Sequence, residues 1–547
     1  MLRLLRVVLL LLAACGGASS PVPPPPARAP SASPEWWNGA VVYEVFVRSF
    51  RDSNGDGAGD LAGLIEKLDH LNDGNPATDT DLGVDAIWLM PIFPSPSHHG
   101  YDVTDYDAVN PGNMALPGYG TMSDFTRLIT ECRRRNIRVI LDWVPNHTSI
   151  QHPWFTDSAS SATSPKRDWY VWRTSSPGWS QPWGGGATWY PHGGAYYYAA
   201  FWDQMPDLDW RNPAVRAEIA AAAGRWLARG VDGFRLDAVR YLVENGPGSG
   251  QEDQPETHAA LKELSASIRA AKPDALIVGE AWAETATIAG YFGSMTAAPG
   301  GDELPLTFDF PLADAVANGI TTGSARPIAA ALDAVARAYP PGAGDAPFLS
   351  NHDQVRLATR LAGNAALEKL AAAILLTQQG TPFIYYGEEI GLQNGPCGGD
   401  ECKRTPMAWD ATSNAGFTSA TAPWWPLSPG AATANVASQT GDPSSLLSRY
   451  RRLIRVRKSS PALSRGGTTR LATDGDAVLA YLRTGATETV LVAHDLGPGA
   501  ASATVTLGGT AADPLFVDPG ATLAAGSTSG SWTVTLPPRG SGIWRVR

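Results

Sequence analysis

Basic charge and long apolar runs are both scarce in this sequence of 547 residues. The 42 lysines and arginines are outnumbered by 53 acidic residues, and the formal net charge is −11. Binding to nucleic-acid phosphates needs clustered Lys and Arg, and the two basic runs, 133–135 and 449–458, are typical of solvated helix faces. Beyond the N-terminus no apolar run is long enough to cross a bilayer. We therefore expect no nucleic-acid partner and no membrane-spanning segment.

Cysteine is scarce as well, with four in the whole chain. Cys397 and Cys402 flank a Gly-Gly-Asp-Glu loop and are predicted to form a small disulfide, because exported proteins meet an oxidising compartment. Cys132 falls on an expected helix and is predicted to be a buried thiol. No histidine lies near these residues in the sequence, which argues against a metal site built from them.

The N-terminus has the pattern of an export signal. Arg3 and Arg6 precede a short apolar run, 7–12, and the sequence Leu-Ala-Ala-Cys at 12–15 resembles a bacterial lipobox. We therefore predict a lipoprotein signal peptide at 1–14, a lipid anchor on Cys15 and a Pro-rich tether at 15–35. An ordinary cleaved signal is the alternative. The expected location is the cell envelope, at the outer membrane or the cell surface.

From residue 36 onward, short β-rich runs alternate with helical patterns, which is typical of βαβ units and a parallel sheet. The chain is also long enough for two or three domains. The expected strands are 41–47, 86–90, 139–143, 233–237, 277–280, 307–310, 348–351 and 383–386. The expected helices are 61–71, 123–136, 213–229, 257–271, 327–338 and 365–378. Eight such strands favour an α/β fold with a closed (β/α)₈ (TIM) barrel, although periodicity alone leaves an open sheet possible.

Two segments depart from this alternation. Residues 148–205 are rich in Gly, Ser and aromatics, and a connection of this length is expected to be functional or a small domain. After residue 458 the chain becomes rich in Thr, Val and Gly, which predicts an appended antiparallel β-sandwich at 459–547. The barrel would then be built from 36–147 and 206–458.

Acidic side chains fall at the carboxyl ends of the expected strands or just beyond them: Asp142, Asp237, Glu280 and Asp353. In a barrel of this kind these ends meet at one mouth, where active sites lie. Arg235 would point the same way as Asp237, two residues further along the strand. Carboxylates that converge in this way suit glycosidic chemistry, in which one group attacks carbon and another delivers a proton.

Five short segments carry a family resemblance. Residues 142–147 (DWVPNH), 233–239 (GFRLDAV), 278–282 (VGEAW) and 349–353 (LSNHD) resemble the four signature regions of the α-amylase family, glycoside hydrolase family 13. Residues 205–209 (MPDLD) resemble its fifth. They occur in the family's order, and the resemblance extends from about residue 36 to 455. It implies a (β/α)₈ barrel with an inserted domain B at 148–205.

The resemblance also implies roles for single residues. Asp237 matches the nucleophile, Glu280 the general acid and then base, and Asp353 the group that binds ring hydroxyls in the distorted transition state. The positions that match sugar-binding residues are Tyr101, Asp102, His147, Arg235 and His352. Arg235 is further expected to orient Asp237.

The motif Asp-Ser-Asn-Gly-Asp-Gly-Ala-Gly-Asp at 52–60 resembles the first half of an EF-hand calcium loop, without its closing Glu. A plain turn rich in Asp and Gly is the alternative. In oligo-1,6-glucosidases and some bacterial amylases the loop after the first strand binds calcium. The resemblance therefore implies calcium as cofactor, with Asp52, Asn54, Asp56, the Ala58 carbonyl and Asp60 as ligands.

The sequence departs from plain α-amylases in places. Arg240 and Tyr241 replace a common Lys-His pair, which puts a leaving-group contact and a second calcium site in doubt. Residues 387–391 and 404–407 resemble α-glucosidases and trehalose synthases, whereas Ala238 is typical of α-1,4-acting members.

These features predict a retaining, endo-acting α-amylase that is a monomer and has an α-glucan substrate. The alternatives are an exo-α-glucosidase, a transglycosylase such as trehalose synthase, and a non-catalytic surface glucan-binding lipoprotein. A protein of the last kind would be expected to lose catalytic carboxylates, and all three are present.

Overall fold

The computed structural model describes residues 36–509 and 512–547. The predicted signal peptide, the anchor at Cys15 and the whole tether lie outside these residues, so they stay predictions. Within the described ranges, no helix is both long enough and apolar enough to cross a membrane.

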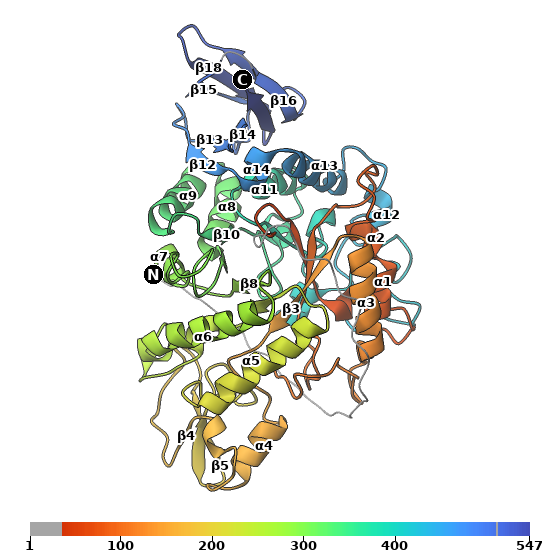
Figure 1. The fold of residues 1–547 in the computed structure, drawn as a ribbon. Helices are drawn as coiled ribbons and strands as arrows, with labels where there is room; N and C mark the ends of the chain where they lie inside the picture. Colours follow the sequence, from red (N-terminus) through yellow and green to blue (C-terminus); the bar gives the residue numbers. More distant parts are fainter. Residues whose placement is uncertain (1–35, 510–511) are drawn as a thin grey trace.

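Eight parallel strands form the predicted barrel, which is nearly closed (Figure 1). β1 pairs with both β2 and β11, and β10 and β11 are the two ends of the hydrogen-bonded order. In that order the strands are β10 (Gly344–Ala346), β9 (Leu306–Phe308), β8 (Leu276–Gly279), β7 (Gly233–Leu236), β3 (Arg138–Trp143), β2 (Ala86–Leu89), β1 (Val42–Val45) and β11 (Phe383–Tyr385). The (β/α)₈ prediction is thereby confirmed.

Helices cover the outside of the barrel. They are α1 (Leu61–Glu66), α2 (Leu68–Leu71), α3 (Met122–Arg134), α5 (Pro213–Ala228), α6 (Pro255–Ala271), α7 (Thr285–Gly290), α8 (Phe310–Thr322), α9 (Arg326–Ala338), α10 (Leu357–Arg360), α11 (Ala365–Thr377), α12 (Val436–Gln439), α13 (Leu446–Ser459) and α14 (Pro461–Arg465). Local sequence sets several starts: Thr121 and Asp124 form a capping box at α3, and Asn212 caps α5 just before Pro213.

Two sequence predictions need correction. The seventh strand was expected at 348–351, but it is β10, Gly344–Ala346, and residues 348–351 form irregular backbone after it. Glycine and aspartate in this strand hide its β character from a pattern based on apolar residues. The expected helix 61–71 is two helices, α1 and α2, with Lys67 between them.

Aromatic side chains fill much of the barrel interior. Phe308 lies 5.5 Å from Trp88 and 4.9 Å from Phe383, measured between ring centroids. Trp88 also donates from Nε1 to Asp142 Oδ2 at 3.1 Å. The packed interior therefore supports the polar residues at the carboxyl ends of the strands directly.

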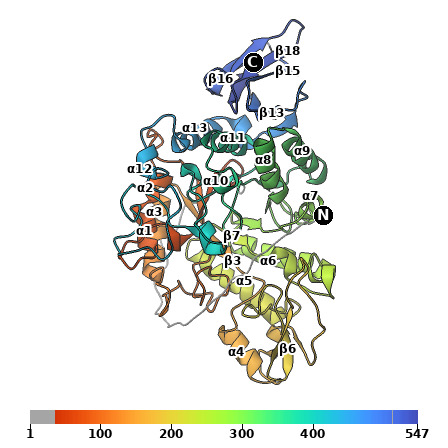
Figure 2. The same cartoon turned by 180° about the vertical axis from the view of Figure 1, so that it is seen from behind.

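The segment between β3 and β7 contains a helix, α4 (Pro153–Ser160), and a three-stranded sheet of order β4-β6-β5. Its strands are β4 (Trp172–Arg173), β5 (Trp189–His192) and β6 (Ala195–Tyr198). Several of its aromatics, including Tyr170, Trp189, Tyr197 and Tyr198, are buried. They form the core of this segment, which projects from the barrel on the side of the molecule opposite the C-terminal sheets (Figure 2).

The C-terminal residues form antiparallel sheets, as predicted. One has the order β12-β13-β14-β19-β16 and the other β15-β18-β17, and an apolar cluster including Val505, Val534 and Trp544 lies among them. The strands are β12 (Gly467–Arg470), β13 (Val478–Thr484), β14 (Thr489–Asp495), β15 (Ala501–Thr506), β16 (Ala512–Val517), β17 (Thr522–Ala525), β18 (Ser531–Leu536) and β19 (Ser541–Val546). Arg449 of α13 bonds both carboxylate oxygens of Asp518, at 2.6 and 2.9 Å, and so joins barrel to sheets.

The cysteine predictions are confirmed. Cys397 and Cys402 form a disulfide, and Cys132 is a buried thiol on α3. Burial also raises the pKa of the Cys132 thiol, so it stays protonated and unreactive at neutral pH.

Candidate active site

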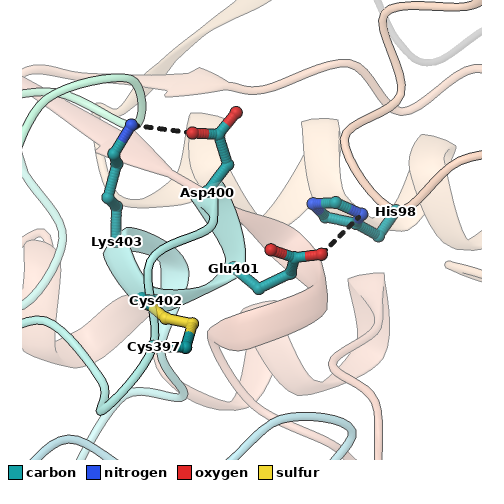
Figure 3. The surroundings of a disulfide bond; sticks show 6 residues. All are labelled: His98, Cys397, Asp400, Glu401, Cys402 and Lys403. Carbon is teal, nitrogen blue, oxygen red and sulfur yellow. Dashed lines mark hydrogen bonds and ion pairs between the residues drawn. A yellow bond between two sulfur atoms is a disulfide. The ribbon is translucent and has the colours of Figure 1, made fainter. Parts of the chain in front are cut away.

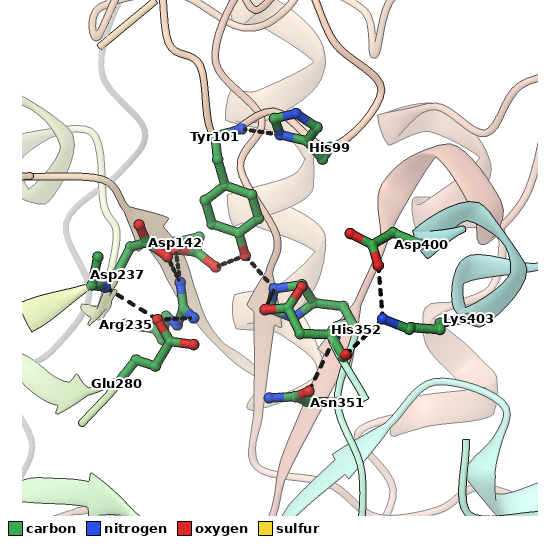
Figure 4. A network of polar contacts seen from close by, with 12 residues as sticks. His99, Tyr101, Asp142, Arg235, Asp237, Glu280, Asn351, His352, Asp400 and Lys403 are labelled. Carbon is green, nitrogen blue, oxygen red and sulfur yellow. Dashed lines mark hydrogen bonds and ion pairs between the residues drawn. The ribbon is translucent and has the colours of Figure 1, made fainter. Parts of the chain in front are cut away.

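The predicted catalytic side chains meet at the carboxyl ends of the barrel strands (Figure 4). Asp142 lies in β3, Asp237 follows β7 directly, and Glu280 follows β8. His352 and Asp353 lie in the irregular segment beyond β10. Four strand ends or loops of one barrel thus supply a single polar cluster, as the parallel topology requires.

Arg235 is the centre of one half of this cluster. Its guanidinium is fully buried, and Nη1 donates to Asp237 Oδ1 at 2.7 Å and to Asp142 Oδ1 at 2.8 Å. Nη2 lies 3.0 Å from Glu280 Oε2. Removing one partner of a buried ion pair costs about 3–5 kcal/mol, because the other charge is left uncompensated. Arg235 therefore makes it possible for these carboxylates to lie together.

Asp237 and Glu280 share this guanidinium but differ in environment. Burial raises the pKa of Glu280 to about 7, against the opposing charge of Arg235. Burial also raises the pKa of Asp237, while Arg235 opposes this through both its charge and a direct hydrogen bond. Glu280 is thus suited to carry a proton near neutral pH, and Asp237 to act as a carboxylate. Two carboxyls with different environments can take different roles.

His352 is the centre of the other half. Its Nδ1 lies 2.7 Å from Glu44 Oε1, and its Nε2 lies 3.1 Å from Asp353 Oδ2. Burial lowers the pKa of His352, but the two carboxylates outweigh burial and raise it to about 10. His352 is therefore an imidazolium at neutral pH, and its charge holds the pKa of Asp353 well below the ordinary range.

Glu44 was not predicted as a site residue from the sequence. It lies in β1 with 2% of its surface exposed, and its carboxylate faces His352 from the opposite side to Asp353. A single acidic residue within the apolar run 41–47 is the signal that could have found it, because a buried charge without a partner is costly.

Tyr101 connects the two halves. Its hydroxyl donates to Asp142 Oδ2 at 3.0 Å and lies 2.6 Å from His352 Nε2. Asp102, the next residue in the chain, was also predicted to bind the sugar. It is buried, and Ser95 and Ser97 both donate to its Oδ1, so this oxygen is already hydrogen-bonded. Its contact with the sugar stays a prediction.

His147 lies beside the cluster. Burial lowers its pKa to about 4, so the ring is neutral at pH 7. Its Nε2 is buried and, among the described residues, has no hydrogen-bond partner. A buried polar atom of this kind suits contact with a ligand hydroxyl.

Two further residues contact Asp353 and were not predicted as site residues. Arg404 donates from Nη2 to Asp353 Oδ1 at 2.9 Å, and Lys403 donates to its backbone carbonyl at 2.8 Å. Both follow the disulfide loop. Their position depends on tertiary folding, so spacing in the sequence does not reveal it.

The departures at 240 and 241 have a structural explanation. Arg240 is held by Asp253 at 2.9 Å and by the Trp282 carbonyl at 2.8 Å, so its guanidinium is already engaged. Tyr241 packs with Trp183 and Phe201, at centroid distances of 5.4 and 5.3 Å. All three rings are half-buried, and Phe201 also contacts His147 at 5.4 Å. Phe201 and Trp183 belong to the segment inserted between β3 and β7, which therefore forms an aromatic wall beside the site.

The predicted calcium loop folds onto its own backbone. Asp52 accepts hydrogen bonds from three loop N–H groups at 2.7–3.0 Å, while Asn54, Asp56 and Asp60 each accept at least one more. Ala58 is buried. Carboxylate, amide and carbonyl oxygens are the donors that calcium prefers. However, nowhere in the described part of the chain do three His, Cys, Asp or Glu side chains gather as a metal site would require. Calcium binding therefore stays a prediction.

The fold and this cluster define an enzyme of the glycoside hydrolase or transglycosylase class. The family profile described as "Alpha amylase, catalytic domain" matches residues 44–466, and the chain belongs to this α-amylase family, glycoside hydrolase family 13. It is 40% identical to alpha-amylase 3 of Dictyoglomus thermophilum over 84% of this chain and 85% of that protein. It is 33% identical to an oligo-1,6-glucosidase of Parageobacillus thermoglucosidasius (84% and 90% covered) and 36% identical to the trehalose synthase/amylase TreS of Mycolicibacterium smegmatis (84% and 82% covered).

Solved structures give the same result. The alpha-amylase from H. orenii superposes with a TM-score of 0.82 at 35% identity, covering 93% of this chain and 100% of that one. The trehalulose synthase MutB from Pseudomonas mesoacidophila MX-45 gives 0.80 at 31% identity, covering 95% and 100%. Both comparisons therefore place the chain in the α-amylase family, while the names of the relatives indicate different activities.

We predict that the activity falls as the pH rises through about 7, because Glu280 with its raised pKa is protonated below that pH and loses its proton above it. A Glu280→Gln variant should lose about 10²–10⁴-fold in kcat/KM on a maltooligosaccharide. It should lose far less on a nitrophenyl α-maltoside, whose leaving group needs no proton. Steady-state kinetics between pH 4 and 9 measures both effects.

The control is Glu263→Gln, which removes only a surface ion pair with Arg216. Two results would contradict the acid role of Glu280. One is an equal loss of kcat/KM on both substrates in Glu280→Gln, and the other is an unchanged fall in the activity of this variant above about pH 7.

Proposed function

We propose that the protein is an endo-acting α-amylase that cleaves α-1,4-glucosidic bonds in starch, glycogen or maltooligosaccharides with retention of configuration. The observation that carries this proposal is the contact of two carboxylates of different character, Asp237 and Glu280, with the single guanidinium of Arg235. A retaining glycosidase needs one ionised and one protonated carboxyl close together.

In the first step, Asp237 attacks the anomeric carbon while Glu280 gives its proton to the departing glycosidic oxygen. The bond to that oxygen breaks, and a covalent glycosyl-enzyme forms. In the second step, the Glu280 carboxylate takes a proton from water, whose oxygen attacks the same carbon and releases Asp237. Asp353 and His352 bind ring hydroxyls, and Tyr101 packs on the sugar.

Three observations support α-1,4 bonds and a polymeric substrate. Ala238, which follows Asp237, is the residue type of α-1,4-acting relatives. The half-buried rings of Trp183, Phe201 and Tyr241 pack together, and Phe201 contacts His147; apolar ring faces of this kind stack on the CH groups of glucose. A relative named alpha-amylase also has 40% identity. Exo-α-glucosidase and trehalose synthase activities are the alternatives, because relatives of both kinds match the chain.

The test is a time course of products from soluble starch and from maltose, with Asp237→Asn as the inactive comparison. We expect a rapid fall in iodine staining, mixed maltooligosaccharides of α configuration, and a loss of about 10⁴-fold or more in the variant. Glucose as the sole product, or trehalose from maltose, would replace the endo-amylase proposal with one of the alternatives. Binding of glucan without turnover by the unmodified protein would favour a surface glucan-binding protein.

We also propose that the loop 52–60 binds calcium. The support is its donor set and its contacts with a distant segment, since the Asp52 N–H donates to Phe417 O at 3.0 Å and the Trp424 N–H donates to Gly57 O at 2.7 Å. A bound ion would stabilise these contacts and take no part in the chemical step.

Calcium at 100 times its Kd should stabilise the fold by about 2.7 kcal/mol. Thermal unfolding of the chelator-treated protein, followed with and without added calcium, measures the gain. Asp56→Ala should abolish it. Asp73→Ala is the matched control, because Asp73 accepts a similar loop N–H at 2.7 Å in another Asn-rich turn. An unfolding temperature independent of calcium would overturn the proposal.

The export signal and lipobox support a last proposal, that the protein is exported and anchored to the envelope by a lipid on Cys15. Activity should then sediment with the membranes for the full chain and remain in the soluble fraction for Cys15→Ser. Equal sedimentation of both would contradict the anchor.

A further inference from the structure

The loop closed by the disulfide is unexplained by the roles assigned so far (Figure 3). Asp400 of this loop and Lys403, which follows it, lie on the His352 side of the site (Figure 4). Besides the Cys397–Cys402 bond, the Gly395 N–H donates to the Cys402 carbonyl at 2.7 Å. The loop is therefore closed twice within a few residues. Lys403 and Arg404 follow it immediately, so their backbone positions are set by this closure.

Residues 403–405, which follow the disulfide loop, are fixed to the barrel by hydrogen bonds. Tyr385 of β11 donates its hydroxyl to the Lys403 carbonyl at 3.1 Å, and Tyr386 donates to the Thr405 carbonyl at 2.8 Å. Ser49 donates to the Arg404 carbonyl at 2.5 Å. The segment 403–405 is thus held between the disulfide loop on one side and barrel residues on the other.

From this position Lys403 reaches both a carboxylate and the site. Its Nζ donates to Asp400 Oδ1 at 2.7 Å and to the Asp353 carbonyl at 2.8 Å, with 15% of its side chain exposed. Asp400 also lies 3.5 Å from Arg404 Nη2. The Asp400 carboxylate therefore offsets the charge of two neighbouring cations, both of which contact Asp353.

Asp353 needs such support, because it lies in irregular backbone beyond β10 and about a third of its side chain is exposed. No strand hydrogen bonds fix its main chain. Its carboxylate is held by His352 and Arg404, and its carbonyl by Lys403. Its N–H donates to Asn351 Oδ1 at 3.0 Å, so loss of the Lys403 contact would release the carbonyl side of Asp353 while its N–H stays held.

Glu401 of the disulfide loop makes a further, weaker contact. Glu401 Oε1 lies 3.9 Å from Nδ1 of His98, in the loop that also carries Tyr101 (Figure 3). Burial holds the pKa of His98 well below its ordinary value, so the ring is neutral and this contact is not an ion pair at neutral pH. Lys403 is therefore the stronger connection between the disulfide loop and the site.

We propose that Lys403 is a positioning residue for Asp353, and that the Cys397–Cys402 disulfide and Asp400 hold Lys403 in place. The inference rests on the proposed function only in that Asp353 binds sugar hydroxyls in the distorted transition state. It assigns to the disulfide a role in turnover in addition to stability.

The first test is Lys403→Met, which keeps the length of the side chain and removes its donors. Because a misplacement of about 1 Å can cost about 10²-fold in rate, we expect kcat to fall about tenfold or more with little change in KM. Lys403→Arg should restore most of kcat, since Arg retains a charged donor. Unfolding temperatures of all variants are measured alongside.

Lys272→Met is the matched control. Lys272 also donates to a carboxylate, Asp232 at 2.7 Å, and to a carbonyl, Val231 at 2.9 Å, and 21% of its side chain is exposed. It lies near the amino ends of the strands, away from the site, so its loss should leave kcat unchanged. Similar kcat losses in both Met variants would show a general effect of stability and overturn the proposal.

The second test is a double-mutant cycle with Cys397→Ala/Cys402→Ala. If the disulfide acts through Lys403, its removal lowers kcat in the wild type and has little further effect in Lys403→Met. Additive losses would show that the disulfide acts independently of Lys403. The ratios are measured on whichever α-glucoside the wild-type enzyme cleaves, so wild-type kcat in Lys403→Met would refute the positioning role and leave the proposed function standing.

Discussion

The ion pairs of one buried guanidinium, that of Arg235, constrain the rest of the site. Three carboxylates from β3, β7 and β8 contact it at 2.7–3.0 Å, and all lie in or next to the buried interior of the barrel. Without a buried cation, three negative charges at this spacing would repel one another and take up protons. The ring of Trp88 below it, 5.3 Å from the guanidinium carbon, adds a cation–π contact and a packed support. The register of β3, β7 and β8 therefore determines how these three carboxylates lie relative to one another.

The second half of the site repeats this arrangement, with a buried cation between carboxylates. Here the cation is His352, held between Glu44 and Asp353, and Tyr101 bonds to both halves. The arrangement explains how Asp353 remains ionised while Glu280, in the same mouth, has a pKa of about 7. Each carboxyl takes its character from the cation nearest to it and from its depth of burial. The loops that follow the strands add Lys403 and Arg404, and so complete the cluster with residues that no strand carries.

Much of this could be predicted from the sequence. The alternation of strands and helices predicted the barrel, because a parallel sheet buried on both faces leaves apolar runs of recognisable length. The strand ends predicted where Asp142, Asp237 and Glu280 meet, since parallel topology gathers those ends.

The missed features have different causes. Strand β10 is short and carries Gly344 and Asp345, so it lacks an apolar pattern. Glu44 is a single acid in a strand, and its partner lies 308 residues away. Lys403 reaches Asp353 only through tertiary folding. The burial of Asp102 by Ser95 and Ser97 is likewise a property of the folded loop.

We propose that Arg235 keeps Asp237 as the ionised nucleophile beside a protonated Glu280. The most direct measurement is covalent trapping with a fluorinated α-glucosyl fluoride, whose ring fluorine slows the second step, followed by peptide mass spectrometry. We expect one glucosyl adduct on the peptide that contains Asp237, formed much more slowly when Arg235 is replaced by Met. An adduct on another carboxylate, or turnover with inversion and no adduct, would contradict it.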